Sequence, residues 1–464
     1  MNNPFLALDQ QLFGDIYTHT EVMDNLTVLC DEFGSRFGGT EGERLAMEFM
    51  QAKLREYGLS HVHTEPVHYL GWRRGPAKLT ILEPIEKEIT CISLPHSPSA
   101  TLEGVLVDMG DGAPKDFDKR AEAIKGNIVM TTSANPKGVR RWIHRNERLG
   151  RSIMAGATGF IFVSQYPAYG PETGGIGHED GESLIPGISV GWEDGAYLQR
   201  LIKRHGQVRI RLETNDTSEP MVSWNVIADL PGKQNPETII MLGCHYDGHD
   251  ISQGAEDPAS GTVAVIEAAR VLAKYAPDLP VTVRFALWGV EEIGLLGSSQ
   301  YAAAHATDLP HIRFYLNMDS AGAITNKAIT LNEWPTLEPL FSGWAEEMAY
   351  PLPIQQSIHA HSDHFPFLMA GVPTGGIEGT EFSGRGYGHT RYDTLDKVKL
   401  NNLREAAMIA ARLAVRIAHA PEWPVQHRTT EEVIALFAGP EYKEEAEYRT
   451  QFEAFYQKAR EEKK

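Results

Sequence analysis

The chain has 464 residues, 42% of them hydrophobic and 23% charged, which is a globular composition long enough for more than one hydrophobic core. Its 43 Lys and Arg stand against 62 Asp and Glu, and the formal net charge of −19 disfavours a surface that binds nucleic-acid phosphates. The 3 cysteines cannot form a disulfide framework and suit a reducing compartment. No secretory leader is recognisable and no apolar run approaches the ~20 residues that span a bilayer, so we expect a cytoplasmic protein without membrane contact.

The first 96 residues begin with helical patterns, and one of them carries its own end signals. Thr40 and Glu43 form a capping-box pattern, and Gly58 supplies a stop. From about residue 97 to 218 the pattern changes to short β-like runs broken by Gly and Pro. This change indicates a small inserted domain.

From Trp224 onward strands and helices alternate, which predicts an α/β fold with a mostly parallel sheet and helices on both faces. The expected strands are 225–229, 238–243, 281–288 and 312–318. The expected helices are 261–275, 297–305, 337–350 and 403–419.

Beyond Ala420 the chain becomes strongly charged and ends in an expected helix over residues 441–464. One face of this helix would carry Tyr448, Phe452, Phe455 and Ala459. We expect that face to pack back on the body of the protein.

Acidic and imidazole residues follow the expected strands, at the sheet edge where open parallel sheets bind their ligands. His245 follows the strand over 238–243, with Asp247 two residues on, and Asp257 lies in a Gly-flanked loop before a helix. The bond from Asp257 to Pro258 is a candidate for cis geometry. Taken singly, such residues are more often loop histidines or helix caps than ligands.

Glu291 and Glu292 close the apolar strand over 281–288. Other Glu-Glu pairs occur in the chain, so the position of this pair is the signal and the dipeptide is not. Adjacent side chains at a strand end point in different directions, so the two carboxylates can take two different roles. Asp319 ends the next strand, and His389 lies in a turn-like segment further on.

Together these residues suit a pair of divalent metal ions. Zinc binds imidazole and carboxylate ligands, and two ions about 3.5–4 Å apart need one carboxylate to bridge them. The chain offers five candidate ligands and one further glutamate that is not needed as a ligand, which meets that requirement.

The stretch from Trp224 to about His419 resembles the co-catalytic di-zinc metallopeptidases of the aminopeptidase type, the group that includes plasma glutamate carboxypeptidase and aminopeptidase Y. The matching segments are Gly243-Cys-His-Tyr-Asp247, Gly254-Ala-Glu-Asp-Pro-Ala-Ser-Gly261, Glu291-Glu-Ile-Gly-Leu-Leu-Gly-Ser298, Asn317-Met-Asp319, Ser362-Asp-His364 and Gly388-His389 with Asp393-Thr394.

The resemblance implies two zinc ions and a role for each metal ligand. His245 and Asp319 would bind the first ion, Asp257 would bridge both, and Glu292 and His389 would hold the second. Cobalt or manganese in place of zinc is left open, because affinity order alone does not set which metal is bound.

The resemblance also implies the catalytic residues. Glu291 would be the general base, and Asp247 would orient His245. Pro258 departs from the family pattern, in which a second Asp often follows the bridging one. The residues expected to contact the substrate are His359, His361, Asp363 and Tyr387, the first two standing near where some relatives have a tyrosine.

The resemblance implies a zinc exopeptidase fold in four parts. Residues 1–96 would begin the peptidase domain, and 97–218 would form an inserted domain similar to the protease-associated domain. Residues 219–420 would form the di-zinc catalytic domain, and 421–464 a charged helical C-terminal extension.

The expected function is that of an aminopeptidase, which hydrolyses the N-terminal bond of a peptide or an amino-acid amide with a metal-activated water. Two alternatives stay open. One is a carboxypeptidase or dipeptidase of the same family, and the other is a non-catalytic binding protein on the same fold. The sequence also leaves a homodimer open.

Overall fold

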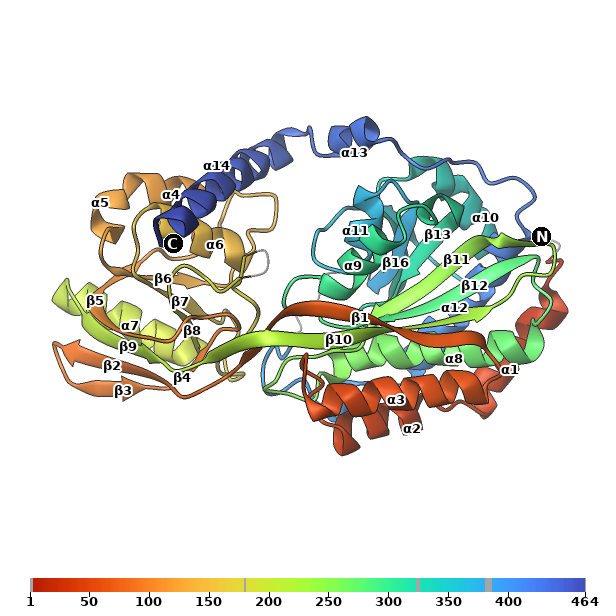
Figure 1. Cartoon of the computed structure of the whole chain (residues 1–464), viewed down its shortest axis with the longest axis horizontal. Coiled ribbons are helices and arrows are strands. Elements are labelled where there is room, and N and C mark those ends of the chain that lie inside the picture. Colours follow the sequence, from red (N-terminus) through yellow and green to blue (C-terminus); the bar gives the residue numbers. More distant parts are fainter. Residues whose placement is uncertain (1–2, 179–180, 323–325, 380–385, 464) are drawn as a thin grey trace. The chain divides into compact units, whose positions relative to one another are not determined.

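The computed structural model describes residues 3–178, 181–322, 326–379 and 386–463. Contacts within the chain divide it into two units. Unit 1 comprises Met1–Tyr69, Val222–Gly384 and Asp393–Leu436, and unit 2 comprises Leu70–Met221, Arg385–Tyr392 and Phe437–Lys464. Each unit contains the greater part of one eight-stranded sheet (Figure 1).

The sheet of unit 1 has the order β1-β10-β12-β11-β13-β16-β14-β15. Its central strands β12, β11, β13 and β16 run parallel, whereas β10 pairs antiparallel with β12 and β14 pairs antiparallel with β16. The strand bounds are β1 (Ser60–Arg73), β10 (Thr217–Leu230), β11 (Asn235–His245), β12 (Val281–Trp288), β13 (Ile312–Asn317), β14 (Lys327–Leu331), β15 (Ile354–Gln356) and β16 (Thr374–Gly379).

Helices cover both faces of this sheet (Figure 1). Their bounds are α1 (Leu6–Thr18), α2 (Val22–Thr27), α3 (Glu41–Glu56), α8 (Ser260–Tyr275), α9 (Leu296–Ala304), α10 (Glu338–Glu347), α11 (His364–Met369), α12 (Leu400–His419) and α13 (Thr430–Leu436). Shorter helical turns are η1 (Val28–Glu32), η2 (Ala255–Ala259), η3 (Leu309–His311), η4 (Pro335–Leu337) and η5 (Leu395–Lys397). Among the residues described, none of the helices combines the length and the apolar character that crossing a membrane requires.

Alternate residues of β11 enter two different hydrophobic cores. Ile240 and Leu242 join the core that contains α8 and α12, whereas Ile239 and Met241 join the core that contains α9 and α11. Successive side chains of a strand point to opposite faces, so a strand covered on both faces must be apolar throughout. The predicted α/β class, with a mostly parallel central sheet and helices on both faces, is confirmed.

The end signals read from the sequence set the bounds of α3. The Oγ1 atom of Thr40 accepts a hydrogen bond from the backbone N–H of Glu43 at 3.3 Å. The carboxylate of Glu43 reaches back to the backbone N–H of Gly39 at 2.6 Å, one residue before the partner of a standard capping box. Gly58 follows the helix with φ 83°, a value that favours glycine.

A buried ion-pair cluster ties α1 to α12. The carboxylate of Asp9 accepts hydrogen bonds from Arg412 at 2.8 Å and from Arg416 at 2.8 and 3.0 Å. Burial raises the pKa of Asp9, but the two guanidinium groups outweigh that effect and lower it from 3.8 to about 2. The N-terminal helix is therefore held by charge as well as by packing.

Asp9→Asn is expected to lower the free energy of unfolding by about 3–5 kcal/mol at neutral pH, because buried Arg412 loses its carboxylate partner and buried Arg416 keeps only Glu347. Since the folded pKa of Asp9 is depressed, its contribution is present above pH 3.8 and is lost as the pH falls toward about 2. Denaturant unfolding at several pH values measures this. The difference in free energy of unfolding between wild type and variant should become smaller as the pH falls through this range. Asp24→Asn, at an exposed position, is the control.

Unit 2 contains a second sheet with the order β3-β2-β9-β5-β6-β7-β8-β4, in which β5, β6, β7 and β8 are parallel. The strands are β2 (Ala77–Glu83), β3 (Lys87–Ile89), β4 (Cys91–Ser93), β5 (Ala100–Asp108), β6 (Ile128–Thr132), β7 (Gly159–Val163), β8 (Gly187–Val190) and β9 (Arg209–Thr214). The helices are α4 (Pro114–Lys119), α5 (Ala121–Ile124), α6 (Arg145–Met154), α7 (Trp192–His205) and α14 (Pro440–Lys463).

The bounds of unit 2 differ from those expected for the inserted domain. Unit 2 begins at Leu70 and not at residue 97, because β2 pairs with β9 and brings the preceding segment into this sheet. The expected extension over 421–464 is divided as well, since α13 lies in unit 1 and α14 in unit 2. Pairing partners more than 100 residues apart set these bounds, and composition does not reveal them.

Helix α14 packs on α6. The sequence predicted only that its apolar face would pack on the body of the protein. The buried side chains are Tyr448, Phe452 and Tyr456, whereas Phe455 is 38% exposed. The prediction that Phe455 belongs to this face is wrong, because the ridge of residues four apart meets α6. Gly150 of α6 permits this approach, since a Cβ there would meet the Tyr448 hydroxyl at 2.1 Å.

Candidate metal centre

His245 ends β11, and its imidazole is buried. Its Nδ1 atom lies 3.0 Å from the backbone oxygen of Asp247, which can only accept, so Nδ1 carries the proton. Nε2 faces Oδ1 of Asp257 at 3.3 Å and Oδ1 of Asp319 at 3.4 Å. Burial lowers the pKa of His245, but Glu291 and the carboxylates of Asp247, Asp257 and Asp319 outweigh burial and raise the pKa well above its ordinary value. These surroundings therefore favour a positive charge at Nε2, which a proton or a bound metal ion can supply.

Such a convergence fits a cation. Two ligand atoms of a tetrahedral zinc ion, with bonds of about 2.0–2.1 Å, lie about 3.3–3.4 Å apart. The separations around His245 have this size. Ligand atoms of His245, Glu291 and Asp319 also lie within 4.8 Å of one another. The donor set of one imidazole and several carboxylates is therefore that of a zinc site.

The Asp257 loop is fixed by a second carboxylate. Oδ1 and Oδ2 of Asp393 accept hydrogen bonds from the backbone N–H groups of Glu256 at 2.8 Å and of Asp257 at 3.0 Å. Burial raises the pKa of Asp393 to about 7, although these two N–H groups oppose the shift. The bond between Asp257 and Pro258 is cis, as predicted.

Glu291 and Glu292 lie in a turn just beyond β12, and Asp247 holds that turn. The carboxylate of Asp247 accepts hydrogen bonds from the backbone N–H of Glu291 at 2.9 Å and of Glu292 at 3.3 Å. Asp247 therefore orients both His245 and the glutamate pair. Burial, followed by the charges of Asp363 and other carboxylates, raises the pKa of Glu291 well above its usual value, although His245 opposes this.

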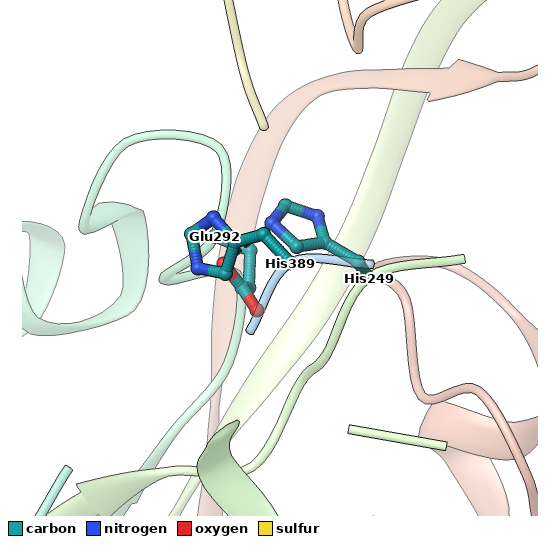
Figure 2. Close-up of side chains that lie close together, drawn as sticks. All are labelled: His249, Glu292 and His389. Atoms are coloured by element: carbon teal, nitrogen blue, oxygen red, sulfur yellow. Dashed lines mark ion pairs between the residues drawn. The ribbon is translucent and has the colours of Figure 1, made fainter. Parts of the chain in front are cut away.

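The second glutamate of the pair contacts a histidine that the sequence analysis did not select. Nε2 of His249 lies 2.9 Å from Oε2 of Glu292, and both side chains are buried (Figure 2). The signal available in the sequence was the spacing His245-Tyr-Asp-Gly-His249, which repeats an imidazole within one loop. The chain has 18 histidines, and the position of His249 alone did not distinguish it from the others.

The residues expected to contact the substrate differ in burial and in the unit to which they belong. Asp363 is fully buried in unit 1, and burial raises its pKa to about 7, with repulsion from Asp319 adding to the shift and His245 opposing it. Nε2 of His359 lies 3.0 Å from Oε1 of Glu378 on β16. His361 is exposed.

His389 and Tyr387 lie in the segment of the chain that clusters with unit 2. The backbone N–H of Thr173 donates a hydrogen bond to the carbonyl of His389 at 2.7 Å. The rings of Tyr387 and Tyr169 meet edge to face, with centroids 6.3 Å apart. The roles predicted for His389 and Tyr387 stay predictions.

Arg36 fixes the loop that follows His245. Its fully buried guanidinium donates hydrogen bonds to five backbone carbonyls, among them Tyr246 at 2.9 Å, Gln253 at 2.7 Å and Gly254 at 2.8 Å. A residue from the N-terminal segment thereby sets the backbone between His245 and Asp257.

Arg36→Met is expected to lower the free energy of unfolding by at least about 3 kcal/mol, because it leaves several buried carbonyls without donors. It should also weaken metal binding, since the loop between two proposed ligands loses its anchor. Denaturant unfolding and zinc titration measure the two effects. Arg44→Met, in the exposed part of α3, is the control and should change neither.

The fold and the arrangement of this site are similar to those of metallopeptidases. Residues 225–414 match Peptidase family M28. This matched segment contains the residues that follow β11, β12 and β13 at the site.

Known proteins resemble the chain over most of its length. Human carboxypeptidase Q is 25% identical over 408 residues, which cover 86% of this chain and 85% of the relative. The crystal structure of a peptidase M28 precursor from Shewanella amazonensis SB2B matches with a TM-score of 0.78 and 25% identity, covering 91% of this chain and 98% of that one. The zinc aminopeptidase BSAP from Bacillus subtilis shares the fold, with a TM-score of 0.66, 21% identity and coverage of 88% and 97%.

Proposed function

We propose that the chain is a di-zinc aminopeptidase that releases the N-terminal residue of peptides. The observation that carries this proposal is the convergence of Asp257 and Asp319 on Nε2 of His245, at 3.3 and 3.4 Å. Separations of this size suit ligands of a shared ion. The resemblance to a zinc aminopeptidase in fold supports the choice of metal.

His245 and Asp319 would hold the first ion, Asp257 would bridge, and Glu292 and His389 would hold the second. When bound, the zinc ions would supply Lewis-acid chemistry, polarising the scissile carbonyl and lowering the pKa of a water molecule. The proton of Nδ1 is held on the Asp247 carbonyl, which keeps Nε2 of His245 available as a ligand.

Glu291 would accept a proton from the water molecule and later release it. One of its carboxylate oxygens, Oε2, lies 4.0 Å from Nδ1 of His245. The hydrogen bond from the backbone N–H of Glu291 to Asp247 fixes where the Glu291 side chain begins. A carboxylate with a raised pKa accepts a proton from water more readily than an ordinary one and can return it to the departing amine. The same side chain therefore serves as base and then as acid.

The resemblance in fold to a zinc aminopeptidase supports the choice of a substrate with a free amine. The second candidate is a carboxypeptidase, which the similarity to human carboxypeptidase Q favours.

His359 would polarise the scissile carbonyl from the protein side. The pKa of His359 is raised above its usual value. Burial alone would lower this pKa, but the hydrogen bond to Glu378 and the charges of nearby carboxylates together have the larger effect. A charged imidazole is a stronger hydrogen-bond donor than a neutral one. His361, Asp363 and Tyr387 are kept as predicted substrate contacts.

A panel of dipeptides and amino-acid amides, blocked at the amine, at the carboxylate or at neither end, tests the proposal together with metal analysis. We expect cleavage to require the free amine and to tolerate an amide in place of the carboxylate, with two zinc ions per chain. Cleavage that requires the free carboxylate would assign the chain to the carboxypeptidases. A metal-free protein without hydrolytic activity would support a binding protein on this fold.

Unit 2 is proposed as a protease-associated domain that acts in substrate selection and not in the chemistry. Its parallel strands β5 to β8, with α6 and α7 packed on them, form a body with its own hydrophobic cores. Cytoplasmic location and homodimer formation stay predictions. Cys30, Cys91 and Cys244 are free thiols, which suits the expected reducing compartment.

A further inference from the structure

His249 and Glu292 form a second buried imidazole–carboxylate pair beside the first. Their Nε2 and Oε2 atoms are 2.9 Å apart, and their side chains are 2% and 3% exposed. Glu291, the neighbour of Glu292, lies 4.0 Å from His245. The last residue of β11 and the loop after it therefore each place a histidine near one of two adjacent glutamates.

We propose that His249 is a ligand of the ion that Glu292 holds, an inference that rests on the proposed function. Neutral imidazole is a common zinc ligand, with a bond of about 2.0–2.1 Å. The separation of 2.9 Å needs to widen by only a few tenths of an ångström for the two atoms to share a tetrahedral ion. The side chains already face each other (Figure 2).

With His249 included, unit 1 by itself offers three ligand groups for the second ion. These are Asp257 as the proposed bridge, Glu292 and His249, and catalytic zinc sites commonly use three protein ligands. His389 keeps its predicted role as a further ligand.

The backbone of His249 is fixed before any ion binds. The hydroxyl of Ser35 donates a hydrogen bond to the carbonyl of His249 at 3.1 Å. Arg36 holds the same loop through the carbonyls of Tyr246 and Gly254 on either side of His249. A ligand on a fixed backbone loses little conformational entropy when it binds, which strengthens metal affinity.

The test compares His249→Gln and His249→Ala with the wild type by zinc analysis and by competition with a chelator. We expect both variants to retain one zinc ion and to bind the second more weakly by over ~100-fold, which exceeds the loss typical of a residue that only hydrogen-bonds a ligand. Melting temperatures without zinc should match, and the rise that zinc produces should be smaller in both variants.

The matched control is His305→Gln. Nε2 of His305 lies 3.0 Å from Oε2 of Glu65, so this pair has the same chemistry and nearly the same separation outside the proposed centre. We expect this variant to bind both zinc ions as the wild type does. A similar loss of zinc there would show that the assay reports general destabilisation, and that result would contradict the proposal.

Cobalt substitution separates ligation from hydrogen bonding. In the Co²⁺-loaded protein each bound imidazole gives an exchangeable ring N–H signal shifted by the unpaired electrons, and both variants should lose one such signal. An unchanged set of signals, with a weaker loss in Gln than in Ala, would make His249 a hydrogen-bond donor to Glu292 and overturn the inference. A wild type that binds no ion overturns the proposed function as well, whereas two ions with no effect at His249 overturn the inference alone.

Discussion

Glu291→Gln is expected to keep both metal ions and to lose turnover by about 10²–10⁴-fold, the usual contribution of a general base. Glu292→Gln is expected to lose metal first, with activity falling as a result. The reason is that the two carboxylates face different partners, Glu291 toward His245 at 4.0 Å and Glu292 toward His249 at 2.9 Å. Metal content per chain, measured beside kcat for each variant, separates the two roles.

Glu346→Gln supplies the control for this pair, because Glu346 begins another Glu-Glu pair and is exposed on α10. It should change neither metal content nor kcat. Equal metal loss in Glu291→Gln and Glu292→Gln would mean that the assignment of the pair is wrong.

Removal of metal by a chelator is expected to abolish hydrolysis, and added zinc should restore it. A water molecule has a pKa of about 15.7 in bulk solvent and about 7 on a zinc ion, so the reaction at neutral pH depends on the metal. The protein should also melt at a lower temperature without zinc, because a bound ion relieves the repulsion among Asp257, Asp319 and their neighbours. Activity that survives in fully demetallated protein would contradict the proposal.

The helices and strands around the site were predictable where an apolar run is bounded by Gly or Pro residues. The strand predicted over 281–288 coincides with β12, and the helix predicted over 261–275 begins one residue late relative to α8. Both lie between Gly or Pro residues and bury nearly every side chain. Local pattern is sufficient for such elements, because the whole segment obeys one periodicity.

Strands that depend on distant partners were not predictable in this way. β16 has the sequence Thr-Gly-Gly-Ile-Glu-Gly, which favours a turn. A Cβ on Gly375 would meet the carbonyl of Thr330 at 2.7 Å and the ring of Phe314 at 2.9 Å, so close packing with β14 and β13 explains this glycine. The antiparallel direction of β10 likewise follows from its pairing with β12.

The sequence indicated which residues belong to the candidate site better than it indicated how they contact one another. His245 ends β11, Asp257 follows the same strand and Asp319 follows β13, and the three side chains meet at this edge of the sheet. The sequence did not indicate that Asp247 would hold the Glu291 turn, because that bond joins a side chain to a backbone group 44 residues away. His249 was missed because its contact with Glu292 joins two side chains that lie far apart in the sequence.

The Arg36 anchor has a consequence for the order in which the protein can be completed during translation. Its carbonyl partners at Tyr246 and Gly254 lie 210 and 218 residues downstream. At about 5–20 residues per second, the ribosome delivers them about 10–40 s after Arg36. Asp9 waits longer still, since Arg416 follows it by 407 residues. The leading helices therefore leave the ribosome long before their docking sites exist, and they must be kept from premature association until nearly all of the chain has been made.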